Sequence, residues 1–167
     1  MRARSIGPLP KGRESVRERR RLDRVPEMAR EMTGARYAAL AVLSEDGTAL
    51  EHFLTAGVDE DIRRAIGHPP RGRGVLGDLI LDACPLRIAD LLRHPRSYGF
   101  PAGHPVMHSF LGVPLMIRGH AWGSLHLAEK RDGEFTRADE RAAVALAQEV
   151  AETIGFERRH QRKPTVA

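Results

Sequence analysis

The sequence predicts a single α+β domain, in which an antiparallel sheet carries N- and C-terminal helices on one face. Short helices and a long loop are expected to cover a pocket on the other face. Two observations favour this fold: apolar strand-like segments are joined by short glycine turns, and helical patterns with one apolar stripe stand at both ends. The length of 167 residues suits one domain with additional residues at the ends.

The charge of the chain is concentrated at its two ends. Residues 1–24 hold nine Lys or Arg against three acids, and residues 157–163 hold four against one, whereas the total is only +5. We therefore predict a basic arm over 1–22, either poorly ordered or helical, a folded domain over 23–156, and a basic tail over 157–167. No aromatic residues alternate with the arginines, so we do not expect nucleic acid as a partner.

The sequence also predicts a cellular compartment. Cys84 is the one cysteine, so no disulfide can form within the chain, and we expect it to be a small buried thiol. No apolar run approaches the ~20 residues that cross a bilayer, and the N-terminus has no apolar signal core. These features favour a cytoplasmic protein that makes no contact with a membrane.

The first half of the chain predicts one longer helix, a hairpin and two short helices. The first helical pattern contains Pro26, so this helix is either kinked there or begins near Asp23. The turn Glu45-Asp46-Gly47 joins two apolar strands, since glycine there readily adopts a positive φ. The expected elements are helices over 13–32, 59–66 and 75–81, and strands over 37–43 and 49–55.

The second half predicts three more strands and the longest helix. A Pro- and Gly-rich loop over 94–107 is unusually long for a compact domain, and such loops are often functional. Thr136 and Asp139 have the spacing of a capping box at the start of the last helix. The expected elements are strands over 86–89, 109–117 and 121–129, a helical turn over 90–92, and a helix from Thr136.

His104 is the first candidate site residue. Gly103 and Pro105 flank it and restrict the backbone, which keeps its side chain out of any helix or strand ladder. Such a histidine could ligate a metal, or it could only cap a turn within the loop.

His126 is the second candidate, at the centre of the last strand. Strand alternation places Trp122, Ser124 and His126 on one face, and we expect this face to line the pocket. The ring of His126 could hydrogen-bond a ligand or coordinate a metal, or it could be a wall residue whose partners are all within the protein.

The segment from Glu129 to Glu140 resembles a known family. Lys130, Phe135, Asp139 and Glu140 have the spacing of the NKFDE-type signature of GAF domains, with Glu129 in place of its asparagine. The resemblance implies a GAF-type fold. It also implies that Lys130 and Asp139 form an internal ion pair with a structural role.

Four further segments resemble the haem-carrying first GAF domain of actinobacterial dormancy sensor kinases. They are Ile-Gly-His-Pro-Pro at 66–70, Gly-Val-Leu-Gly at 74–77, Gly-Phe-Pro-Ala-Gly-His-Pro-Val-Met at 99–107 and Phe-Leu-Gly-Val-Pro at 110–114. This resemblance implies a b-type haem with His104 as its proximal iron ligand. His126 stands where those domains have a distal tyrosine, so we assign it as a distal residue or a sixth ligand. The remaining residues predicted to bind the cofactor are Phe53, His68, Val75, Leu76, Phe100, Met107, Trp122 and Ser124.

The predicted function is therefore that of a small-molecule sensor and not of an enzyme. The domain would bind haem and sense O2, NO, CO or the redox state of the iron. The alternative is a GAF module that binds another small ligand, such as a cyclic nucleotide, or that acts only as a dimerisation or regulatory unit. We expect a homodimer through the terminal helices and a separate signalling partner.

Overall fold

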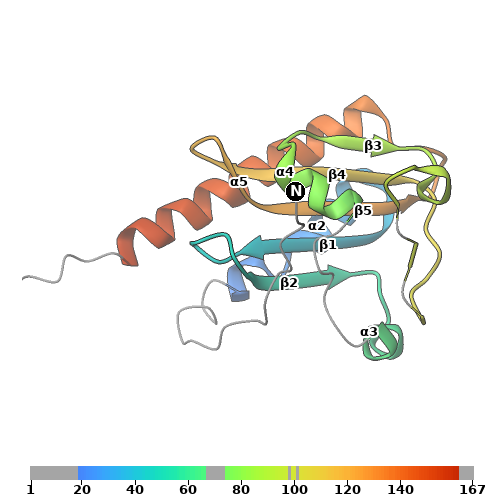
Figure 1. The fold of residues 1–167 in the computed structure, drawn as a ribbon, viewed down its shortest axis with the longest axis horizontal. Coiled ribbons are helices and arrows are strands. Elements are labelled where there is room, and N and C mark those ends of the chain that lie inside the picture. The colour runs from blue at the N-terminus through green and yellow to red at the C-terminus, as the bar shows by residue number, and fades with distance from the viewer. Residues whose placement is uncertain (1–18, 67–73, 98, 101, 162–167) are drawn as a thin grey trace, which may run out of the picture.

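The computed structural model of the chain describes residues 19–66, 74–97, 99–100 and 102–161, and its centre is a five-stranded antiparallel sheet (Figure 1). The strand order is β2-β1-β5-β4-β3. This sheet and its helices confirm the predicted α+β fold. The strands are β1 (Ala35–Leu43), β2 (Leu50–Ala56), β3 (Leu86–Ile88), β4 (Phe110–Ile117) and β5 (His120–Lys130).

Two helices, α2 (Val25–Thr33) and α5 (Arg137–Gln161), pack against one face of the sheet. Their apolar stripes meet the inward side chains of β1, β4 and β5, which are almost completely excluded from solvent. The break in the first helix falls at residues 23–24, so Pro26 is the second residue of α2, because proline suits the first turn of a new helix. The core on this side includes Leu22, Ala29, Leu40, Leu111, Leu125, Leu127, Phe135, Ala147 and Ile154.

The other face carries α4 (Val75–Leu81), the 3-10 turn η1 (Leu91–Arg93) and the segment that leads into β4. We call it the α4 face. The helix α3 (Glu60–Ile66) follows β2 at the edge of the sheet (Figure 1). Each predicted strand and short helix starts and ends within two residues of the observed one, and the last helix begins one residue after the predicted start at Thr136.

Two register shifts interrupt the sheet at one end. Between β1 and β2 the pairing moves from Val42–His52 to Leu43–Leu50, so Glu51 is an extra residue on β2. Between β4 and β5 the pairing moves from Pro114–Ser124 to Met116–Ala121, so β5 is the strand with the extra residue. Such bulges redirect the side chains beside them.

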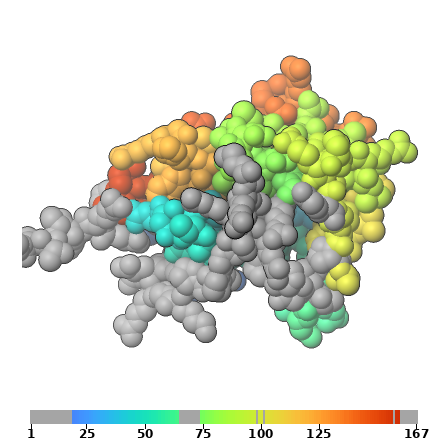
Figure 2. All heavy atoms as spheres, in the orientation of Figure 1, coloured from blue at the N-terminus to red at the C-terminus, as the bar shows by residue number. Residues whose placement is uncertain are grey.

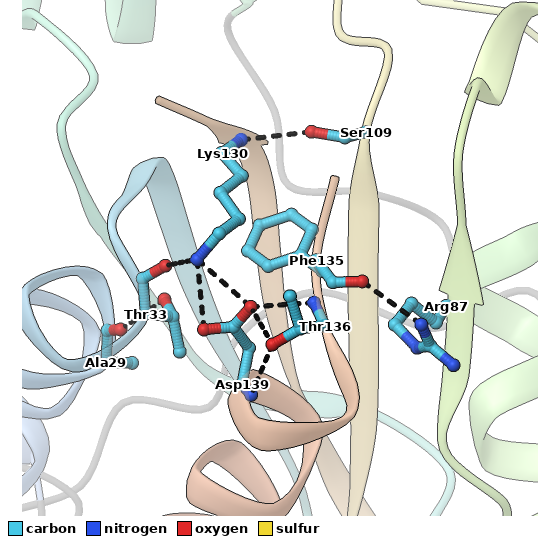
Figure 3. A network of polar contacts seen from close by, with 8 residues as sticks. All are labelled: Ala29, Thr33, Arg87, Ser109, Lys130, Phe135, Thr136 and Asp139. Carbon is cyan, nitrogen blue, oxygen red and sulfur yellow. Dashed lines mark hydrogen bonds and ion pairs between the residues drawn. The ribbon is translucent and has the colours of Figure 1, made fainter. Parts of the chain in front are cut away.

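The GAF-like signature forms a polar network where β5, α2 and α5 meet (Figure 3). Lys130 Nζ lies 3.0 Å from Asp139 Oδ1 and donates a 2.7 Å hydrogen bond to the carbonyl of Thr33. Asp139 in turn accepts from the Thr136 amide at 2.7 Å, which completes the predicted cap of α5. The lysine therefore joins the end of α2 to the start of α5.

The backbone conformation at Glu129 explains why the NKFDE-type signature has asparagine at this position. Its φ is +56°, a left-handed conformation in which asparagine is more common than glutamate. Here the longer carboxylate accepts a hydrogen bond from the backbone amide of His108. Glu129 thereby fixes the end of the loop that contains His104 to the sheet.

Candidate functional site

The α4 face gathers most of the predicted site residues. Val75, Leu76, Phe100 and Met107 pack in one apolar cluster with Leu79, Phe110 and Ala128. Phe53 packs beside it in a second cluster. In Figure 2, which shows this face, atoms of α4 and of the loop before β4 cover the strands. His68 lies outside the described residues. The second cluster comprises Ala41, Leu43 and Leu50, with Phe53 and Ile80 against them.

His104 is held in a defined orientation on the loop. Its ring stacks on Phe100, with ring centroids 4.9 Å apart and planes 13° from parallel. Its Nδ1 lies 2.7 Å from the carbonyl oxygen of Pro105. Because a carbonyl can only accept, the neutral ring has its proton on Nδ1 and its lone pair on Nε2. This is the tautomer of a histidine that ligates a metal through Nε2.

His126 and Ser124 form a buried polar pair in an otherwise apolar region. Ser124 Oγ and His126 Nε2 are 2.7 Å apart, and the ring of Phe110 lies 6.2 Å from that of His126. Burial lowers the pKa of His126 to about 4, so the imidazole is neutral at physiological pH. A serine beside a histidine is also the start of a catalytic pair, but an imidazole with so low a pKa is a poor general base at pH 7.

The surface beside His126 is filled by α4. Gly112 is the register partner of His126, and a Cβ there would lie 2.4 Å from Leu79 Cδ1. Leu79 is almost fully buried, so α4 lies directly on β4 at this point. Two open hollows of the described chain lie elsewhere, one of about 700 Å³ between the C-terminal half of α5 and the β4–β5 turn, and one of about 560 Å³ along β3.

Substituting Gly112→Ala should therefore lower the free energy of unfolding by about 1–2 kcal/mol, since the added methyl forces Leu79 out of its place. Urea denaturation measures the loss. The same change in a Leu79→Ala background should cost less, because the truncation removes the closest clash and leaves only Phe110 Cε1, at 2.8 Å, too near the methyl group. Equal losses in both backgrounds would contradict the direct packing of Leu79 on Gly112.

Trp122 is the one described site residue that the structure places away from the α4 face. Its ring centroid lies 5.0 Å from the guanidinium carbon of Arg158, which belongs to α5 on the other side of the sheet. The expected alternation with Ser124 and His126 was wrong because the β5 bulge interrupts it between Trp122 and Ser124. The expected burial of Cys84 was also wrong, since this residue is exposed.

Gly112 and Leu79 were not among the residues predicted to lie on this face. A glycine within an apolar strand pattern signals a close approach of another element, and Gly112 had that signal. Leu79 has no comparable signal, because its contact depends on how α4 docks. Within the described residues, no group of three His, Cys, Asp or Glu side chains is placed to hold a metal ion, and no helix is long and apolar enough to span a bilayer.

An antiparallel sheet between two terminal helices and a layer of short helices, with a polar pair beneath that layer, defines a small three-layer α+β domain. The chain belongs to the GAF domain family, whose model matches residues 17–155. That assignment agrees with the signature network around Lys130 and Asp139.

Solved structures support the same fold. The chain is similar to the GAF domain of a phosphoenolpyruvate-protein phosphotransferase from Coxiella burnetii, with 22% identity, a TM-score of 0.74 and 87% of each chain covered. It is also similar to a type II free methionine-R-sulfoxide reductase from Thermoplasma acidophilum, with 19% identity, a TM-score of 0.65, and 86% of this chain and 96% of that chain covered. At these identities the matches establish the fold alone.

Proposed function

We propose that this GAF domain senses a small molecule on its α4 face and that the ligand is a b-type haem held by His104. The orientation of His104 carries the proposal. Its Nδ1 is engaged by the Pro105 carbonyl, and its ring lies half-buried against Phe100, beside the apolar cluster. A haem ligand needs a neutral imidazole with a fixed ring in apolar surroundings.

The residues of the α4 face fit the chemistry of a haem. Phe100, which stacks on His104, belongs to the apolar cluster of Met107, Val75 and Leu76, and the Ser124–His126 pair offers polar contacts on the same face. When bound, the iron would supply a site for O2, NO or CO, or a change of oxidation state. Because Leu79 covers Gly112 next to His126, a ligand in this place must displace α4. Displacement of α4 is how we expect binding to be signalled to the rest of the domain.

The test is the absorption spectrum of the purified protein after addition of haemin. The wild-type protein should show a sharp Soret band, and His104→Ala should lose or broaden it because the iron loses its axial ligand. His108→Ala is the matched control, since His108 lies four residues away in the same segment and its exposed ring pairs with Asp90. Absence of a sharp band in the wild type, or a band unchanged by His104→Ala, would reject haem ligation by His104.

The role of His126 has a separate readout. If His126 is a sixth ligand, the reduced protein should be six-coordinate without any added gas, and His126→Phe should make it five-coordinate. If His126 acts only as a distal hydrogen-bonding residue, the reduced wild-type protein should already be five-coordinate.

The packing of α4 favours a second candidate function. Leu79 packs on Gly112 beside His126 as closely as residues pack in a hydrophobic core. This packing suits a GAF module that binds another ligand or acts without one. Thermal unfolding with and without haemin or a cyclic nucleotide separates these functions, because only a ligand that binds the folded state raises the melting temperature.

We also propose that the helix side of the domain forms a homodimer, as expected for the terminal helices. Met28 and Met32 of α2 are 43% and 51% exposed, and Phe156 of α5 is 56% exposed at the edge of the 700 Å³ hollow. Arg118, Arg159 and Glu152 line the same hollow, so charges of both signs are available for a self-complementary contact.

Substituting Phe156→Glu should convert the dimer to a monomer, because it replaces an exposed aromatic side chain of the proposed interface with a charge. Light scattering after size exclusion measures the mass. Leu81→Glu is the control, since Leu81 is even more exposed but belongs to α4 on the opposite side of the sheet. A wild-type monomer, or a dimer that Phe156→Glu leaves intact, would contradict this interface.

A further inference from the structure

Arg158 occupies an unexpected place on α5. It continues the buried stripe of Ala147, Val150 and Ile154 toward the C-terminus, and it is only 7% exposed. The end of α5 projects at the end of the sheet where the β1–β2 and β4–β5 turns lie (Figure 1). Most arginines at a helix C-terminus remain in solvent and interact only with the helix dipole. A buried arginine at this position instead has specific partners.

These partners come from three different strands. Arg158 Nη2 donates to the backbone carbonyl of Leu43 at 3.0 Å and to Glu51 Oε2 at 2.7 Å. The guanidinium carbon lies 5.0 Å from the ring centroid of Trp122. The Glu51 side chain is 18% exposed, so the ion pair is largely removed from water. Charge-assisted hydrogen bonds of this kind are about twice as strong as neutral ones.

The two β-bulges create this binding place for the guanidinium. Glu51 is the extra residue of the β1–β2 register shift, and Trp122 lies in the β4–β5 shift. Bulges at a sheet end usually redirect a side chain toward a particular contact. Both bulges here supply contacts to the same arginine.

The partners of Arg158 also connect to the α4 face. Leu43, whose carbonyl binds Arg158, buries its own side chain with Leu50 in the cluster against which Ile80 of α4 packs. Trp122 lies on β5 two residues before Ser124, which pairs with His126. Contacts therefore run from Ile80 of α4 to the cluster of Leu43, and from the Leu43 carbonyl to Arg158.

We propose that Arg158 is a latch that couples the position of α4 to the docking of the last turns of α5. With α4 docked, Leu43, Glu51 and Trp122 hold Arg158, and residues 155–161 stay on the sheet. With α4 displaced, the Leu43 contact shifts and these turns are released. The coupling itself is independent of which ligand displaces α4; its use in sensing rests on the proposed function.

Hydrogen exchange of the ligand-free protein tests the latch. Arg158→Gln should speed amide exchange in 155–161 about tenfold or more, the size expected from losing a buried charge-assisted hydrogen bond. Arg141→Gln is the control, with the same charge change at an exposed arginine near the start of α5 and outside the 700 Å³ hollow, and it should alter exchange in 155–161 less than about twofold. Arg158→Lys keeps the charge and loses the planar fork, so it provides a measurable variant if Arg158→Gln does not fold.

A second substitution tests the coupling. Ile80→Ala should also speed exchange in 155–161, whereas Leu81→Ala, next to it and exposed, should not. In an Arg158→Gln or Arg158→Lys background, Ile80→Ala should have little further effect on this segment. Unchanged exchange after the Arg158 substitution, or an Ile80→Ala effect of equal size with and without Arg158, would overturn the latch. Because no haem is added, neither result depends on haem binding.

Discussion

Substituting Asp139→Asn should lower the free energy of unfolding by about 3 kcal/mol, because it leaves Lys130 charged and largely buried without its counter-charge. The side chains of Lys130 and Asp139 are only 16% and 11% exposed. The same lysine also donates to Thr33, so the lost pair loosens both α2 and α5. Urea denaturation at pH 7 measures the loss.

A neighbouring ion pair provides the control for Asp139→Asn. Glu140 pairs with Arg87 at 3.1 Å, but both side chains are about one-third exposed, so Glu140→Gln should cost less than about 1 kcal/mol. Lys130→Met removes the other partner of the pair. The double variant Lys130→Met/Asp139→Asn should lose clearly less free energy of unfolding than the sum of the two single losses. Additive losses would mean that the two groups do not stabilise the fold as a pair.

Acidification should destabilise the domain between pH 6.5 and about 4 through His126. Burial lowers the pKa of His126 from 6.5 to about 4, so above pH 6.5 the ring is neutral in both the folded and the unfolded state. As the pH falls through this window the unfolded chain takes up a proton that the folded protein excludes. The free energy of unfolding should fall by about 3 kcal/mol across the window, and below it both states are protonated.

The contribution of His126 is isolated by comparison with His126→Gln, which cannot titrate. Urea denaturation at pH 7.0, 5.5 and 4.5 should give a steeper loss for the wild type than for the variant. Protonation of Asp139 should lower the free energy of unfolding further, at a pH below the His126 window. Burial opposes its ionisation, but hydrogen bonds from Thr136 and Lys130 outweigh that effect and lower its pKa. Parallel pH profiles for the wild type and His126→Gln would contradict a buried neutral imidazole.

Much of the fold could be predicted because local patterns and tertiary packing agree. The apolar run of β1, the Glu45–Gly47 turn and the Thr136–Asp139 cap each define an element from residues close in sequence. The spacing from Lys130 to Asp139 identified the family, since it preserves one ion pair across a turn. These signals depend on neighbours within a few residues, which the sequence displays directly.

The candidate site was only partly predictable. The sequence determined that His104 stands on a stiff loop and that His126 and Ser124 share a strand face. Only the tertiary structure decided that Pro105 fixes the ring of His104 and that Leu79 fills the surface over Gly112. Contacts between distant segments depend on how α4 docks, and the pattern of a seven-residue helix does not specify that.

The sequence by itself thus determined the GAF fold, the Lys130–Asp139 pair and the strand face of His126. Only the tertiary structure decided that Trp122 leaves that face and that Arg158 of the expected basic tail is buried against it. The physical reason is the pair of β-bulges. Each inserts one residue into a ladder, and this changes which side chains meet across the sheet without changing the apolar pattern that predicts the strand.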